Sequence, residues 1–128
     1  TKAADFSFKI DGSDTLTNLY SISSPYILLV FYNPDCEHCI KEIKELKNND
    51  TINRLIRQDS LIVISIPPEV DELSWKNNLK NMPKNWKNAY CGACETITKK
   101  YIWLVPEEFW LNKEKSVIKI NIKKEEDF

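Results

Sequence analysis

The sequence predicts an α/β domain in which helices flank a central mixed β-sheet. Unbroken apolar runs at residues 26–32 and 61–66 are typical of parallel strands buried on both faces. Residues 37–46 follow the first run with the periodicity of an amphipathic helix. Apolar segments at residues 109–111 and 117–122 flank a polar turn at 112–115, which indicates a β-hairpin. The length of 128 residues favours one domain covering residues 1–128.

The elements around the first apolar run are short. Apolar residues alternate with polar ones over residues 6–10, which predicts a half-buried strand, and residues 11–13 have the composition of a turn. Residues 16–20 fit a short helical or irregular connector. After the helix over 37–46, a second helix is expected around residues 52–57, with its apolar side chains on one side.

Beyond the second apolar run the pattern weakens. Residues 71–79 are expected to form a helix, and the polar segment 81–90, broken by a proline, a loop that carries Trp86. A short helix is expected over residues 93–101. The charged tail after Ile122 offers no apolar face, so the predicted fold lacks a closing C-terminal helix.

The composition excludes several classes of function. Eighteen basic and 19 acidic residues give a net charge of −1, which offers no general attraction to nucleic acid. No apolar run approaches the roughly 20 residues that span a membrane. Only 2 glycines occur and no glycine-rich phosphate loop, so we expect no bound organic cofactor. The first residues resemble neither an initiator methionine nor a signal peptide, so we expect a mature or trimmed chain.

The four cysteines form two local pairs, Cys36 with Cys39 and Cys91 with Cys94. Cys-x-x-Cys pairs indicate redox chemistry or metal binding rather than a disulfide framework. Cys36 follows a buried strand and opens a helix, where the free N–H groups and the helix dipole stabilise a thiolate. We therefore predict that Cys36 is the nucleophile and that Cys39, one turn further in, is the shielded thiol that resolves mixed disulfides.

Two side chains between these cysteines are candidates for tuning the pair. A cationic or hydrogen-bonding His38 would favour the Cys36 thiolate and make the disulfide a stronger oxidant. Glu37 and Asp35 add negative charge that opposes this effect. The direction of the balance, and with it the direction of electron flow, stays open at the level of sequence.

The segment ILLVFYNPDCEHC, residues 27–39, resembles the strand and active site of thioredoxin-like proteins, in particular the extracytoplasmic TlpA/ResA-like group of Bacteroidetes. The resemblance extends over most of the chain, including DFSF at residues 5–8, MPKNW at 82–86 and YIWLVPEEFWL at 101–111. It implies a thioredoxin-like fold and a thiol–disulfide oxidoreductase that acts on protein thiols with a redox partner protein. It also implies an extracytoplasmic, periplasmic location with a lipid or membrane tether upstream of Thr1.

The resemblance also assigns roles to individual residues. Pro106 matches the cis-proline that faces the dithiol, and the Val105 backbone would pair with an extended substrate. Glu42, three residues after Cys39, matches an active-site glutamate that can accept a proton during resolution; a solvated helix glutamate is the alternative. The chain departs from thioredoxin itself at Val30, where thioredoxin has a buried aspartate.

The sequence leaves the role of the second cysteine pair undecided, and it allows alternative functions for the chain. Cys91 and Cys94 could form an auxiliary local disulfide, relay electrons to the first pair, or bind a metal. In the last case all four thiols would make a zinc site, although 51 residues separate Cys39 from Cys91, against the about 15–20 usual in zinc ribbons. We therefore assign no metal ligands. A redox-inactive binding domain is the third class, and retention of both cysteines of the first pair argues against it.

Overall fold

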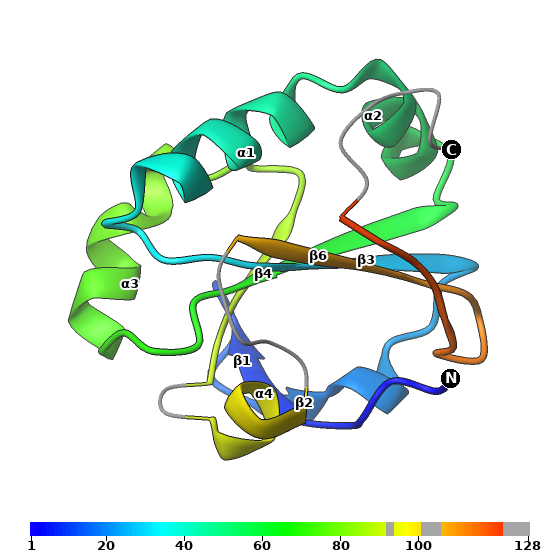
Figure 1. Cartoon of the computed structure of the whole chain (residues 1–128), viewed down its shortest axis with the longest axis horizontal. Helices are drawn as coiled ribbons and strands as arrows, with labels where there is room; N and C mark the ends of the chain where they lie inside the picture. The colour runs from blue at the N-terminus through cyan, green and yellow to red at the C-terminus, as the bar shows by residue number, and fades with distance from the viewer. Residues whose placement is uncertain (92–93, 101–105, 122–128) are drawn as a thin grey trace.

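The computed structural model describes residues 1–91, 94–100 and 106–121. Within these residues one mixed sheet of seven strands is flanked by helices (Figure 1). The elements follow in the order β1 (Ser7–Ile10), β2 (Leu16–Asn18), the 3-10 turn η1 (Leu19–Ser21), β3 (Tyr26–Phe31), α1 (Glu37–Lys47), α2 (Asp50–Arg57), β4 (Leu61–Ile66), α3 (Glu72–Asn78), the 3-10 turn η2 (Leu79–Asn81), β5 (Lys87–Tyr90), α4 (Glu95–Lys100), β6 (Glu107–Leu111) and β7 (Val117–Ile120).

The strand order is β2-β1-β5-β4-β3-β6-β7, and the two apolar runs form the centre of the sheet. β3 and β4 are parallel over their whole length, from Tyr26 opposite Leu61 to Phe31 opposite Ile66. β5 continues the parallel part beside β4, whereas β6 runs antiparallel to β3 and β1 antiparallel to β5. The predicted mixed sheet with central buried strands is therefore confirmed.

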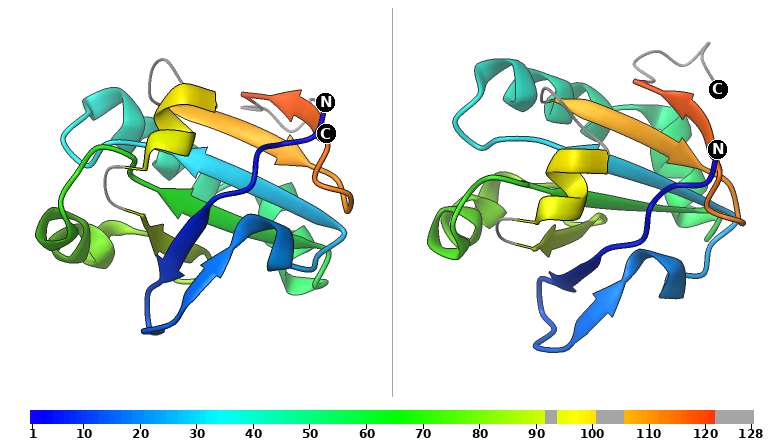
Figure 2. Two further views of the ribbon diagram at one scale, coloured as in Figure 1. Left: turned by 90° about the horizontal axis from the view of Figure 1, so that it is seen from below. Right: turned by 60° about the horizontal axis from the view of Figure 1, so that its bottom comes forward.

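The sheet separates two apolar cores. One core packs on the side of α1 and α2 and contains Val30 and Cys39 together with apolar residues of both helices. The other lies on the side of α4 and contains Phe31 and Ile97. Successive residues of β3 alternate between the cores, as the pleat of a strand requires. Figures 1 and 2 show α1 and α2 over one face and α4 under the other.

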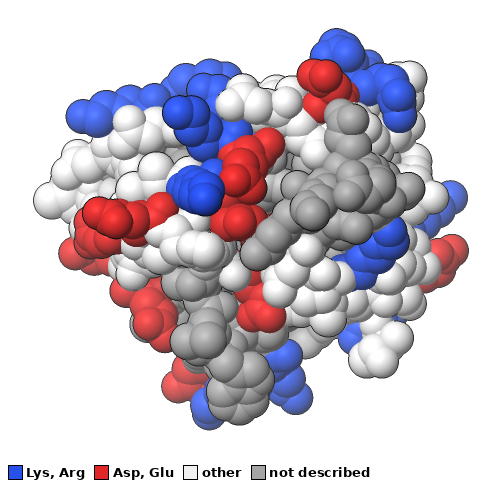
Figure 3. All heavy atoms as spheres, turned by 45° about the horizontal axis from the view of Figure 1, so that its top comes forward, with Lys and Arg blue, Asp and Glu red and all other residues white. Residues whose placement is uncertain are grey.

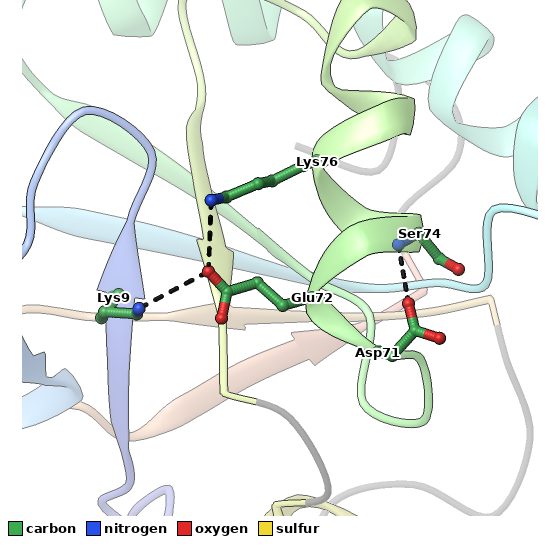
Figure 4. Close-up of polar contacts among 5 residues, drawn as sticks. All are labelled: Lys9, Asp71, Glu72, Ser74 and Lys76. Carbon is green, nitrogen blue, oxygen red and sulfur yellow. Dashed lines mark hydrogen bonds and ion pairs between the residues drawn. The ribbon is translucent and has the colours of Figure 1, made fainter.

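α3 lies at the margin of the sheet and is tied to β1 by charge (Figure 4). Glu72 lies 3.7 Å from the Lys9 ammonium of β1 and 3.5 Å from that of Lys76, one turn along its own helix. The Asp71 carboxylate accepts a hydrogen bond of 2.7 Å from the Ser74 N–H and so caps the helix. These side chains are at least partly exposed to solvent, so the ion pairs contribute little to the stability of the fold.

Two segments differ from the sequence-based expectation. Residues 16–18 form the edge strand β2, and only η1 at residues 19–21 matches the expected short helical connector. The expected loop over 81–90 ends in the strand β5. β5 carries a polar Asn88 in the sheet, which hides the strand from pattern analysis. The Asn88 amide accepts a hydrogen bond from the Ser65 hydroxyl at 2.7 Å and donates one to the Pro83 carbonyl at 3.2 Å, so its burial is compensated.

The remaining helices and the hairpin are found where they are expected. The prediction that a charged tail replaces a closing C-terminal helix concerns residues 122–128, which lie outside the described residues. Among the helices that the structure describes, none is long and apolar enough to cross a bilayer.

Candidate active site

The candidate site lies where the central strand β3 ends and α1 begins. Cys36 is the N-cap residue of α1, as predicted, and its backbone is extended with φ −95° and ψ 115°. The turn before it is closed by a hydrogen bond of 3.1 Å from the Cys36 N–H to the Asn33 carbonyl. The Asn33 side chain in turn accepts a hydrogen bond of 2.9 Å from the Asp35 N–H. Local hydrogen bonds therefore place the Cys36 sulfur at the positive end of the helix.

The two thiols have different environments. Cys36 is half-buried, whereas Cys39 is fully buried against the core beneath α1. The Cys36 sulfur accepts a hydrogen bond of 3.2 Å from the Cys39 N–H, and the Cys39 sulfur accepts one of 3.4 Å from the Asn33 N–H. All four cysteines of the chain are free thiols in this structure. The first pair is thus described in its dithiol form, with one accessible sulfur and one shielded sulfur.

Burial raises the pKa of the Cys39 thiol to about 12. A hydrogen bond with the Cys36 side chain contributes to this rise in pKa, whereas the hydrogen bond from the Asn33 backbone N–H lowers the pKa. The negative charges of Cys36 and Glu108 also raise it. Cys39 therefore keeps its proton at neutral pH.

Glu108 is the site residue that sequence analysis did not identify. Its side chain has no exposed surface, and it lies in β6 directly opposite Val30 of β3. A signal was present: two adjacent glutamates open an apolar strand, so the alternation of the strand has to turn one of them inward. The sequence alone does not show which helix that inward side chain meets.

The three other side chains predicted near the first cysteine pair all lie on α1, but they differ in exposure. Glu37 and His38 are exposed in the first turn of α1, next to the cysteines in sequence. Glu42 is buried on the same helix and 5% exposed, so it is not the solvated glutamate of the alternative hypothesis.

Pro106 lies at the same end of the sheet as the dithiol. It is half-buried and directly precedes β6, whose Glu107 pairs with Phe31 at the end of β3. The prediction for Val105, including the conformation of its bond to Pro106, falls outside the described residues.

The second pair lies on the other side of the sheet. Cys91 and Cys94 are half-buried between β5 and α4 and pack against the core of the α4 face, whereas Cys36 and Cys39 pack against the core of the α1 face (Figures 1 and 2). Burial, followed by the hydrogen bond with Cys94, raises the pKa of the Cys91 thiol. The described residues, which include all four cysteines, contain no group of three or more acidic, histidine or cysteine side chains placed to hold a metal ion. In this structure the two cysteine pairs pack against different cores and do not meet in one cluster.

A hollow of about 350 Å³ opens beside the start of α1. Its wall is formed by Pro34 of the active-site turn, by Ile40, which is 54% exposed, and by Tyr32 at the end of the central strand. Lys44 and Lys47 border it on α1, and the segment around η2 closes it on the far side. The hollow therefore combines apolar side chains with lysines and asparagines beside the active-site turn.

The surface around α1 carries both signs of charge. The exposed residues of this helix include Lys41, Lys44 and Lys47 as well as Glu37 and Glu45. Figure 3 shows basic and acidic side chains side by side on the visible face. This mixture gives no field of a single sign over the site, consistent with the net charge of −1.

Neither a protein-family model nor a curated protein matches this sequence. Solved structures do. A thioredoxin-like protein from Bacteroides caccae superposes with a TM-score of 0.85 and 32% identity over 95% of this chain, which spans only 44% of that protein's length. The C-terminal domain of an uncharacterized protein from Bacteroides fragilis gives a TM-score of 0.86 and 28% identity, covering 99% of this chain and 91% of that one.

A thiol-disulfide oxidoreductase from Bacteroides fragilis has the same architecture at 19% identity, with a TM-score of 0.80 and coverage of 98% of this chain and 93% of that one. These comparisons establish a thioredoxin-like fold for the chain, as the sequence predicted.

Proposed function

We propose that this protein is a thiol–disulfide oxidoreductase that exchanges a Cys36/Cys39 dithiol with disulfides of protein substrates. One observation carries the proposal: an accessible thiol caps the helix that follows the central strand, and a buried thiol lies one turn behind it. The structural neighbours with oxidoreductase names support the same chemistry. No organic cofactor is required, because the two sulfurs carry the electrons.

The exchange proceeds in two displacements. The Cys36 thiolate attacks one sulfur of a substrate disulfide, forms a mixed disulfide and releases the other substrate sulfur as a thiolate. Cys39 then attacks the Cys36 sulfur, closes the Cys36–Cys39 disulfide and releases the second substrate thiol. Two electrons pass from the dithiol to the substrate, and the same steps in reverse oxidise a substrate dithiol.

The same proposal assigns roles to individual residues around the two cysteines. Glu37 and His38 tune the Cys36 thiolate, Glu42 acts near Cys39, and the Val105–Pro106 segment binds the substrate backbone. The resemblance of the sequence to the TlpA/ResA-like group favours an extracytoplasmic, periplasmic protein that is tethered to a membrane and exchanges electrons with a redox partner protein.

Single-cysteine variants test the order of attack. Because Cys39 resolves the mixed disulfide, Cys39→Ser is expected to accumulate covalent adducts with a peptide disulfide or with oxidised glutathione, visible by mass spectrometry of the intact protein. Both variants are made in a Cys91→Ser/Cys94→Ser background, which removes the half-buried thiols of the second pair. In this background Cys36→Ser is the matched control and should accumulate no adducts, because its remaining thiol, Cys39, is buried. Adducts on Cys36→Ser alone, or disulfide reduction that survives Cys36→Ser, would overturn the proposal.

A further inference from the structure

A carboxylate is buried inside the sheet next to the candidate dithiol. Glu108 has no exposed surface, although it is the second residue of its strand. Its backbone is held by the loop after β7: the Glu108 N–H donates to the Asn121 side-chain oxygen at 2.9 Å, and its carbonyl accepts from the Asn121 N–H at 2.7 Å. The position of this glutamate is therefore fixed by strand pairing and by a two-bond clamp.

The register of the sheet determines the face on which Glu108 lies. In an antiparallel pair, residues directly opposite each other project from the same face. Glu108 lies opposite Val30, and Val30 belongs to the core that contains Cys39. Trp110, two residues further along β6, belongs to the same core. The Glu108 side chain is thus on the α1 face, on the side of Cys39.

The neighbouring glutamate has the opposite orientation. Glu107 lies opposite Phe31, which belongs to the core on the α4 face, as does Phe109. Glu107 is also partly exposed. Two adjacent residues of the same type therefore provide a test position and a matched control.

The electrostatics of Cys39 give a second, independent indication. Apart from burial and the hydrogen bonds at the helix start, the influences on the pKa of Cys39 are the charges of Cys36 and Glu108. Cys36 loses its charge once it is bound to a substrate sulfur. In the mixed disulfide, Glu108 is therefore the one group of these two that still acts on Cys39 through its charge.

We propose that Glu108 is the proton acceptor for Cys39 in the resolving step of the exchange; this inference rests on the proposed function. In that step the Cys39 S–H proton passes to the Glu108 carboxylate while the Cys39 sulfur forms its bond to the Cys36 sulfur. The mixed disulfide breaks, the substrate sulfur leaves with the electron pair, and the proton on Glu108 then passes to that leaving thiolate. The net change is one substrate disulfide reduced to two thiols and one dithiol oxidised.

The location of this carboxylate gives it a specific advantage over solvent. Cys39 is fully buried, so water reaches it poorly, and a base within the core removes the proton without opening the structure. Val30 occupies the strand position opposite Glu108, so the chain places its buried acid on β6 and an apolar residue on β3.

Single-turnover kinetics on the full chain separate the two displacements. The reduced protein is mixed with a peptide disulfide, quenched by acid and alkylation, and the mixed and closed disulfides are counted by mass spectrometry. Glu108→Gln should leave the formation of the mixed disulfide unchanged and slow its resolution about a hundredfold, the lower end of the range for loss of a general base. Glu107→Gln should change neither step, and Glu108→Asp should restore part of the resolving rate.

A thiol titration adds a readout that does not depend on turnover. In a Cys36→Ser background, the pH dependence of Cys39 alkylation should shift to lower pH with Glu108→Gln, because a negative charge is removed, and not with Glu107→Gln. If Glu108→Gln does not fold, carbon-13 NMR of the wild type replaces it: the Glu108 carboxyl signal should move when the dithiol is oxidised. A constant signal would overturn the inference.

The outcomes distinguish the inference from the proposed function. A wild-type protein that forms no mixed disulfide would overturn the exchange and, with it, the role of Glu108. Normal exchange with unchanged resolution in Glu108→Gln would overturn the role of Glu108 alone. Slow resolution in Glu42→Gln with a normal rate in Glu108→Gln would move that role to Glu42 and equally overturn the inference.

Discussion

The two thiols of the Cys36/Cys39 pair differ because one caps a helix and the other lies in a core. The same three-residue spacing gives Cys36 the free N–H groups of the helix start and gives Cys39 an apolar environment. The helix-cap position of one thiol and the burial of the other therefore distinguish Cys36 from Cys39 before any neighbouring side chain contributes. Glu37 and His38, both exposed, can adjust this difference without creating it.

The buried thiol makes the stability of the reduced protein sensitive to alkaline pH. The Cys39 pKa is raised from 9.0 to about 12 by burial, so between these values the folded state keeps a proton that the unfolded state loses. Stability from this group is complete below pH 9 and is lost as the pH rises towards 12. We expect the melting temperature of the reduced protein to fall over this range.

Cys39→Ala is the comparison, because it removes the titrating thiol and should give a shallower decline. Tyr32, whose pKa burial raises to about 12, and Cys91 titrate in the same direction and remain in both proteins. Scanning calorimetry in reductant from neutral to alkaline pH measures the difference. Equal slopes for the two proteins would contradict the prediction.

The sequence predicts those site residues that lie close together in the chain, and it misses those that strand pairing brings together. Cys36 and Cys39 lie within one helical turn, so the motif and its place after an apolar strand were sufficient to find them. Glu108 reaches the same site through the pairing of β6 with β3, across almost eighty residues of chain. Only the register of that pairing selects Glu108 over Glu107, and register is not encoded in a single segment.

At the scale of elements, strong patterns were predictive and short ones were not. β3, β4 and α1 were found because long apolar runs and helical periodicity persist through them. β2 has three residues and β5 has four, and both are strands only because neighbouring strands supply the hydrogen bonds. Tertiary pairing outweighs local propensity in such segments.

α2 illustrates an element that is held by its cap. The Asn49 side chain accepts a hydrogen bond of 2.9 Å from the Ile52 N–H, and Ile52 is fully buried beneath the helix. We expect Asn49→Ala to destabilise the protein by about 1 kcal/mol, the usual cost of losing an N-cap. Chemical unfolding in urea measures this cost.

Asn49→Ser keeps a capping oxygen and should retain most of the stability. Both variants should leave the reactivity of Cys36 unchanged, since α2 begins well after the active-site turn. A loss of stability in the serine variant as large as in the alanine variant would show that the cap is not the cause.

At the scale of the whole molecule, the sheet divides the chain into two chemical compartments. The first dithiol belongs to the core on the α1 face and the second to the core on the α4 face, with the central strands between them. A relay of electrons between the pairs would need a sulfur of one pair to reach a sulfur of the other. We therefore expect Cys91 and Cys94 to act independently of the first pair, for instance by forming a local disulfide between β5 and α4.

The double variant Cys91→Ser/Cys94→Ser tests this separation. Because Cys36 and Cys39 pack against the core on the α1 face and Cys91 and Cys94 against the other core, we expect the double variant to reduce a peptide disulfide at the wild-type rate, measured from the release of substrate thiol under a fixed supply of reductant. Its melting temperature under oxidising conditions should fall, because the local cross-link is lost. A loss of turnover without a loss of stability would favour the relay, and would require the two pairs to meet in a conformation different from this one.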